Sequence, residues 1–208
     1  MPSELRPSSD YEHVFVLVKR LRLGWLLKHF PPLLVRTLYV FVNGFITIAL
    51  LSMLAVFTGT AFVFPSLGPT AYLFFFSPLA ESASPKNAIL GHAIGLACGY
   101  SAFRFAAVEY GPAVFPHDTY WPKVLAAALS LAFTGALIVL LRLNHPPAGA
   151  TTLILSLGIV PVPRDLVIIE FAVVLLTVQA FLINRLAGLP YPVWHHKRPA
   201  LLAAKRES

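Results

Sequence analysis

The residues of this chain that could bind a small solute lie around two short Pro-Gly motifs. The first motif reads Pro-Ser-Leu-Gly-Pro-Thr over 65–70, and the second reads Asn-His-Pro-Pro-Ala-Gly-Ala-Thr-Thr over 144–152. Proline and glycine end helices or begin new ones. A helix start leaves unbonded N–H groups and carries about half a positive charge. Two such starts that faced one cavity would attract a small anion without a lysine charge in lipid.

Side chains around the two motifs add hydrogen-bond donors and backbone access. The donors are hydroxyl, amide and imidazole groups, on Thr70, Asn144, His145, Thr151 and Thr152. Gly68 and Gly149 would let the backbone approach a solute closely. An imidazole can also gain a proton near neutral pH. The alternative is that the Asn-His pair only caps the preceding helix while Pro146 and Pro147 bend the chain.

The composition places these motifs in a membrane protein. Of the 208 residues, 57% are hydrophobic and 12% are charged, with a mean hydropathy of +0.74. A soluble domain carries about 25% charged residues. From Thr37 to Ala80 there is no Lys, Arg, Asp or Glu, and an apolar run of about 18 residues is enough to span a membrane. These apolar runs exclude a soluble catalytic domain. A secreted disulfide scaffold is excluded as well, because the single cysteine, Cys98, cannot form a disulfide within the chain.

The predicted fold is an all-α polytopic membrane protein with four spanning helices and two re-entrant half-helices. The four predicted spans cover about 37–59, 87–108, 123–141 and 165–186, and the half-helices cover about 69–76 and 148–160. The half-helices are too short to cross a bilayer by themselves. In the second span, His92 lies in a Gly-x-x-x-Gly stripe that favours close helix packing. It is either a packed hydrogen-bonding residue or a residue of the solute cavity.

The order of these segments suggests an internal repeat. A shift of 81 residues superposes three identical pairs, Pro65 on Pro146, Gly68 on Gly149 and Thr70 on Thr151. With two crossings in each half, both halves would enter the membrane from the same side. This predicts two parallel pseudo-repeats related by an axis along the membrane normal. Chance recurrence of helix-breaking residues is the alternative.

Basic residues predict the orientation. They concentrate in the segments 1–36 and 187–208, and Arg104, Lys123 and Arg185 are expected on the same side as these segments. Lys86, Arg142 and Arg164 are expected on the opposite side. By the positive-inside rule we expect both termini in the cytoplasm. We expect the protein itself in the inner membrane of the cell. The predicted domains are a cytoplasmic segment 1–36 with an interfacial amphipathic helix at about 11–30, a membrane domain 37–186 and a basic tail 187–208. The net charge of +7 is therefore explained by the orientation and by contact with lipid headgroups. We expect no nucleic-acid partner.

Further short motifs accompany the two Pro-Gly motifs in a recognisable order. Ser-Pro-Leu-Ala follows at 77–80, Pro-Lys-Asn at 85–87 and Gly-His at 91–92. Together with the His-Pro-Pro run, they make the chain resemble the HPP family of integral membrane proteins, usually described with four transmembrane helices. The resemblance adds Ser66 and Lys86 to the candidate site, although Lys86 stands where arginine is usual and 81–84 lengthens a linker. Some plastid and cyanobacterial members of that family are described as nitrite transporters.

The residues around the Pro-Gly motifs predict a transporter or channel for a small inorganic anion, and the resemblance implies nitrite. The alternatives are an accessory or assembly subunit without its own flux and a membrane-embedded enzyme. The seven histidines are scattered and do not form the clusters of di-metal membrane enzymes, so we expect no enzyme activity, no metal and no cofactor. Four spans make a thin wall for a pore, which favours a homo-oligomer.

Overall fold

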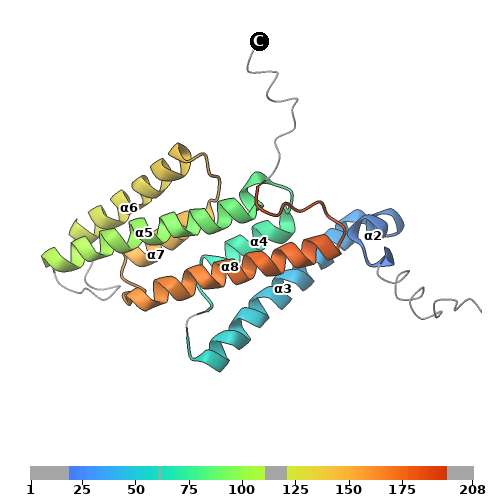
Figure 1. Ribbon diagram of the computed structural model, residues 1–208, viewed down its shortest axis with the longest axis horizontal. Coiled ribbons are helices and arrows are strands. Elements are labelled where there is room, and N and C mark those ends of the chain that lie inside the picture. Colours follow the sequence, from blue (N-terminus) through green and yellow to red (C-terminus); the bar gives the residue numbers. More distant parts are fainter. Residues whose placement is uncertain (1–18, 61, 111–120, 196–208) are drawn as a thin grey trace, which may run out of the picture.

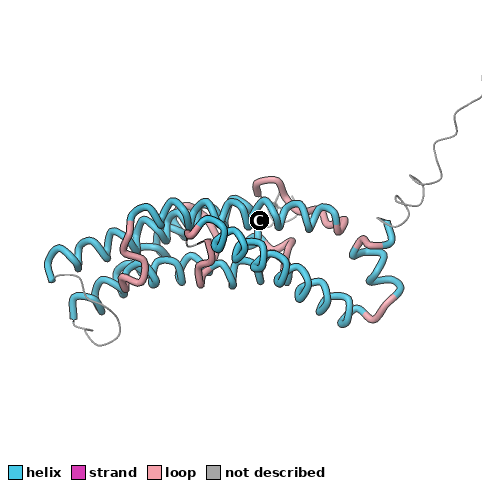
Figure 2. Tube along the Cα trace, turned by 90° about the horizontal axis from the view of Figure 1, so that it is seen from below, coloured by secondary structure: helices cyan, strands magenta, loops and turns pink. Residues whose placement is uncertain are grey.

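The computed structural model describes residues 19–60, 62–110 and 121–195, and within these ranges it contains helices and loops and no strand (Figures 1 and 2). The helices are α2 (Leu23–His29), α3 (Pro32–Thr58), α4 (Leu67–Phe76), η1 (Glu81–Ala83), α5 (Pro85–Tyr110), α6 (Trp121–Leu140), α7 (Pro147–Ser156) and α8 (Pro163–Leu186). The predicted all-α class is therefore confirmed for the described residues. Residues 11–18 of the predicted amphipathic helix at 11–30 and the tail from 196 lie outside them, and α2 lies within the described part of that predicted helix.

Three of the long helices are apolar and long enough to cross a membrane: α3, α6 and α8. The fourth long helix, α5, has 26 residues, but it carries Lys86, Asn87, His92 and a stripe of glycines, so its composition is less apolar. Proline stands in the first turn of α3, α7 and α8, where its missing N–H would have had no helical partner anyway. Since α3 begins at Pro32, the first long helix starts earlier than the predicted boundary at residue 37.

One end of the molecule, which we call the α2 end, gathers the start of α3 and the ends of α4 and α8 (Figure 1). The N–H of Leu23 in α2 donates to the carbonyl of Ala187 just beyond α8, at 2.9 Å. Near the end of α8, the Asn184 amide donates to the carbonyl of Phe74 in the last turn of α4, at 3.1 Å. The hydroxyl of Tyr39, close to the start of α3, donates to the Asn184 side-chain oxygen at 2.8 Å.

The start of α5 and the end of α6 lie at the α2 end as well. The N–H of Lys86 donates to the carbonyl of Trp194, beyond α8, at 2.9 Å. Leu141 and Leu143, which directly follow α6, line a cavity together with Lys86 and Leu90. Helices α3 and α5 therefore run away from the α2 end, whereas α6 and α8 run toward it, as Figure 1 shows.

These directions correct the predicted topology. Residues 62–66 and α4 bring the chain toward the α2 end, and residues 141–146 and α7 carry it the opposite way (Figure 1). Each half thus passes along the molecule three times, and an odd number of passes gives the second half the opposite direction. The prediction of parallel halves with re-entrant half-helices is wrong. The predicted grouping of basic residues is wrong as well, because Lys86 and Arg142 lie at the α2 end, where the described residues begin and end, while Arg104 and Lys123 lie at the far end. The order long, short, long is the same in both halves.

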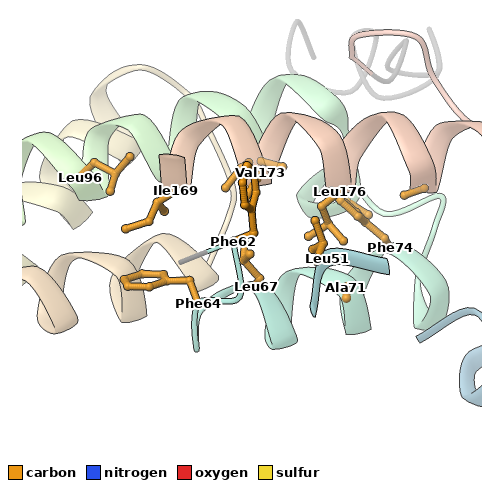
Figure 3. Packing of buried hydrophobic residues seen from close by; sticks show 14 of the residues in the cluster. Leu51, Phe62, Phe64, Leu67, Ala71, Phe74, Leu96, Ile169, Val173 and Leu176 are labelled. Atoms are coloured by element: carbon orange, nitrogen blue, oxygen red, sulfur yellow. The ribbon is translucent and has the colours of Figure 1, made fainter. Parts of the chain in front are cut away.

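One face of the short helix α4 packs into the apolar core, which explains how a ten-residue helix is held against the molecule. Leu67 and Phe74 of α4 are fully buried against Ile169, Val173 and Leu176 of α8 (Figure 3). Burial of such side chains contributes roughly 1.5–3 kcal/mol each. The outer faces of α3 and α6, by contrast, expose large apolar side chains, among them Phe41, Phe45, Val56, Phe133 and Val139. That pattern suits helices that face lipid.

The segment after α8 is fastened to the start of α5 by Tyr191. This side chain is fully buried, and its hydroxyl donates to the carbonyl of Ala83. Tyr191→Phe would leave that carbonyl without its partner, and we expect a loss of about 1–2 kcal/mol in the free energy of unfolding. Thermal unfolding of the purified protein in detergent measures this. Tyr72→Phe is the matched control, because the Tyr72 ring is half exposed, and equal melting temperatures for both variants would contradict the prediction.

The same tyrosine should make stability depend on alkaline pH. Burial raises the pKa of the Tyr191 hydroxyl above its ordinary value of 10. A folded-state pKa above the unfolded one contributes stability that is complete below the unfolded value and is lost as pH rises toward the folded value. The wild type should therefore lose stability above about pH 10, and Tyr191→Phe should lack this part of the loss.

Candidate functional site

Helices α4 and α7 begin beside each other inside the molecule. Ser66 immediately precedes α4, and Thr151 lies in the first half of α7. The Thr151 hydroxyl donates to the Ser66 hydroxyl oxygen at 2.8 Å, and both side chains are fully buried. Because α4 runs toward the α2 end and α7 runs away from it, two oppositely directed helices start at one buried point.

His92 of α5 joins the two helix starts. Its Nδ1 lies 2.7 Å from the Thr151 hydroxyl oxygen, and its Nε2 lies 2.8 Å from the hydroxyl oxygen of Thr70 in α4. Both His92 and Thr70 are fully buried. The imidazole thus connects α4, α5 and α7 through its two ring nitrogens. His92 is therefore a hydrogen-bonded residue, and its place in a solute site stays a prediction.

His145 completes the arrangement from the loop before α7. Its Nε2 lies 3.3 Å from the Thr70 hydroxyl oxygen, and its Nδ1 donates to the carbonyl of Ser82 at 2.9 Å. The two imidazole rings are 5.0 Å apart between centroids. We call Ser66, Thr70, His92, His145 and Thr151 the imidazole–hydroxyl cluster. Its members come from sequence positions far apart, and none of them is more than 1% exposed.

The glycine stripe of α5 allows α7 to approach closely enough for these contacts. A β-carbon placed on Gly95 would lie 2.6 Å from the carbonyl oxygen of Ala148, and one on Gly99 would lie 2.5 Å from that of Thr152. On Gly91 it would lie 2.9 Å from the β-carbon of His145. Small residues four apart let two helix backbones meet in this way, so the predicted packing role of the stripe is confirmed.

The starts of the short helices differ from the expectation of free N–H groups. At α7, the N–H of Ala148 donates to the carbonyl of His145 at 3.1 Å, and that of Gly149 to Pro146 at 3.0 Å. The two prolines have no N–H at all. At α4, the N–H of Leu67 donates to the carbonyl of Phe64 at 2.9 Å. Any donors for an anion at α7 must therefore come from side chains, while the positive ends of the two helix dipoles remain.

A family model, for the transmembrane region of HPP proteins, matches residues 30–192. The chain belongs to the HPP family. No curated protein and no solved structure matches it. The matched range includes all five members of the imidazole–hydroxyl cluster. In this HPP protein the family's His-Pro-Pro motif therefore supplies one imidazole of the cluster and the first residue of α7.

Several predicted site residues of the HPP protein lie away from the cluster. Asn144 and Pro146 are exposed, and Lys86 is partly buried at the α2 end. Gly68 is exposed, and a β-carbon there would meet no atom within 4 Å, so no described part of the chain packs closely against it. Its position one residue after the start of α4 turns it outward.

Three other predicted residues pack next to the cluster. Pro147 is buried at the start of α7, and Gly149 faces a methyl group of Leu131 in α6. The hydroxyl of Thr152 accepts a hydrogen bond from Thr134 of α6 at 3.0 Å. These residues support the start of α7, and within the described residues none of the three is a hydrogen-bond partner of either imidazole.

Sequence reasoning missed two groups of this site. Thr134 was overlooked, although Ser130 lies one helical turn before it and the two form the polar side of an otherwise apolar helix. Polar residues at that spacing in a spanning segment indicate an inward face. The Ser82 carbonyl, which orients His145, lies in the linker 81–84 and carries no sequence signal. Within the described residues, no three His, Cys, Asp or Glu side chains are placed to hold a metal ion.

Proposed function

We propose that this HPP protein carries a small inorganic anion, nitrite or a similar ion, across the membrane through the imidazole–hydroxyl cluster. The observation that carries the proposal is the meeting of two oppositely directed helix starts at one buried set of side-chain donors. Discontinuous helices whose positive ends point at a buried site are a recurring way for transporters to hold an anionic substrate.

The charge of the cluster suits an anion. It holds hydroxyl and imidazole groups and no carboxylate, so no negative charge opposes the substrate. Hydroxyls and N–H groups are donors to nitrite oxygens, and two helix dipoles add a positive potential without a fixed charge in the hydrocarbon. The substrate has to be small, because the cluster residues touch one another and enclose little space.

The topology suits alternating access. We propose that the chain crosses the membrane six times, with α3, α5, α6 and α8 as continuous helices. The other two crossings combine residues 59–66 with α4 and residues 141–146 with α7. The two halves would then form an inverted repeat around the cluster, and rocking of one half against the other would expose the cluster to each side in turn. The arrangement described above is the closed one.

Basic residues support the orientation. At the α2 end lie Lys19, Arg20, Arg22, Lys28, Arg36, Lys86, Arg142 and Arg185, whereas Arg104, Lys123 and Arg164 lie toward the far end. The corrected topology moves Lys86 and Arg142 to the α2 end and moves Arg104 and Lys123 to the far end, so the excess of basic residues at the α2 end is kept. By the positive-inside rule the α2 end is cytoplasmic. The inner membrane, the homo-oligomer and the absence of enzyme activity stay predictions.

Uptake of isotopically labelled nitrite into vesicles that contain the purified protein tests the proposal. We expect uptake at least tenfold above protein-free vesicles, at an alkaline pH where little nitrite is present as permeant nitrous acid. Competition by unlabelled nitrate, formate and chloride ranks the substrates. The absence of protein-dependent flux for all four anions would contradict the proposal. Flux that appears only with a co-purified partner would favour the accessory-subunit alternative.

A further inference from the structure

The imidazole–hydroxyl cluster contains more hydrogen-bond contacts than a neutral cluster has hydrogens to fill them. Six contacts of 3.3 Å or less join its side chains to one another and to the carbonyls of Ser66 and Ser82. A seventh, at 3.5 Å, reaches the carbonyl of Pro147. Three hydroxyls and two neutral imidazoles supply one hydrogen each, which is about five in all. At least one contact therefore lacks a hydrogen.

The direction of the hydroxyl bonds shows where an added hydrogen would go. The Thr70 hydroxyl donates to the carbonyl of Ser66 at 3.1 Å, and the Thr151 hydroxyl donates to the Ser66 hydroxyl oxygen at 2.8 Å. Both oxygens consequently turn lone pairs toward the ring nitrogens of His92. Only a protonated imidazole donates from both nitrogens. The Nε2 of His145 faces the Thr70 oxygen in the same way.

Burial opposes a bare charge at this place. Transfer of an ionised group into a low-dielectric interior is costly unless an opposite charge comes with it. Within the described residues, neither imidazole has a carboxylate as hydrogen-bond partner. A proton in the cluster would thus find hydrogen-bond acceptors in place, but no opposite charge beside it. A bound anion would supply that opposite charge.

We propose that the cluster binds one proton together with the anion, so that transport is an electroneutral cotransport of anion and proton. This inference rests on the proposed function. The proton enters a ring-nitrogen lone pair from water on one side and leaves to water on the other side. The anion crosses with it, and no bond within the anion breaks. Proton and anion each make the binding of the other more favourable, as linkage requires.

Other titratable groups near the cluster do not replace the imidazoles. The elements packed against α5 and the cluster are η1, α4, α6, α7 and α8. Their described titratable side chains, with those of α5 itself, are Tyr72, Glu81, Lys86, Cys98, Tyr100, Arg104, Lys123, Arg164, Asp165, Glu170 and Arg185. None of these is a hydrogen-bond partner of His92 or His145 among the contacts above. Each imidazole has the other as its titratable neighbour.

The test measures internal pH and labelled nitrite uptake in the same wild-type vesicles, with the membrane potential set by potassium and valinomycin. We expect the protein-dependent uptake to acidify the interior with one proton per anion and to stay within twofold when the potential is reversed. Nitrite uptake that brings no protein-dependent acidification and rises severalfold at an inside-positive potential would overturn the inference and leave the proposed function standing. The absence of any protein-dependent uptake would refute both.

Two variants locate the proton. Glutamine in place of His92 or His145 keeps one donor and one acceptor and cannot be protonated. We expect the protein-dependent acidification to be at least tenfold smaller in His92→Gln and in His145→Gln than in the wild type. His29→Gln is the matched control, because His29 is exposed and stacks on Trp25 in α2, and it should behave as the wild type. If both cluster variants keep full acidification, the imidazoles do not hold the proton and the inference is wrong.

The wild type offers a further readout that does not depend on how the variants fold. At a fixed nitrite concentration, protein-dependent uptake should rise severalfold as external pH is lowered from alkaline to neutral, because the proton is a second substrate. Uptake that stays constant across that range, after subtraction of the protein-free rate, would contradict cotransport.

Discussion

Leucine in place of Gly99 is expected to separate α7 from α5 and to reduce the yield of folded protein at least tenfold. A β-carbon at this position would already lie 2.5 Å from the Thr152 carbonyl oxygen and 2.9 Å from the Leu155 β-carbon. Backbone atoms of two packed helices cannot move aside as a flexible side-chain tip can. Overpacking of a core ordinarily costs about 1–3 kcal/mol, and here a branched side chain would have to fit where even one carbon does not.

The measurement is the amount of monodisperse protein in detergent, together with its melting temperature. Gly135→Leu is the matched control, since Gly135 lies in α6 and a β-carbon there meets no atom within 4 Å. Gly99→Ala should fall between the wild type and Gly99→Leu. A Gly99→Leu protein with wild-type yield and melting temperature would show that α5 and α7 do not pack as described.

Removal of the His92 side chain is expected to abolish transport, with protein-dependent nitrite uptake reduced at least tenfold. His92→Ala removes the partner that the hydroxyls of Thr70 and Thr151 share, and the loss of each of these two hydrogen bonds costs about 0.5–1.5 kcal/mol. The variant also opens a space between the starts of α4 and α7. Both the stability of the closed form and the site itself should suffer.

Comparison with two other variants separates these effects. His29→Ala removes an exposed imidazole at the α2 end and should keep wild-type uptake and melting temperature. His92→Gln should recover most of the stability lost in His92→Ala, because an amide can bond both hydroxyls, without recovering the acidification. Wild-type uptake by His92→Ala would contradict the role of the cluster in transport.

The family and most of the cluster could be predicted from the sequence. Ser66, Thr70, His92, His145 and Thr151 all stand within the short motifs that mark an HPP protein. Helix-breaking residues act locally, so the positions of α4 and α7 followed from the proline and glycine spacing. The apolar runs determined that the chain belongs in a membrane for a similarly local reason, because each segment has to be compatible with hydrocarbon by itself.

The orientation of individual residues in the short helices could not be predicted in the same way. Helix α4 is apolar nearly all round, so no amphipathic face tells which side meets the protein. Gly68 was therefore assigned to the site although it is exposed, and so was Asn144, which is exposed in the loop before α7. The free N–H groups expected at α7 were likewise absent, because a tight turn before the helix uses them.

The tertiary structure alone decided the direction of the two halves. Whether residues 59–66 return to the surface or descend into the molecule depends on what they pack against, and Phe62 meets Phe171 of α8 at 6.1 Å between ring centroids. That contact joins distant parts of the chain and leaves no local signature. The sequence by itself determined the apolar segments, their breaks and the donors beside them. Long-range packing determined that three passes form each half and that two oppositely directed helices start at one pair of histidines.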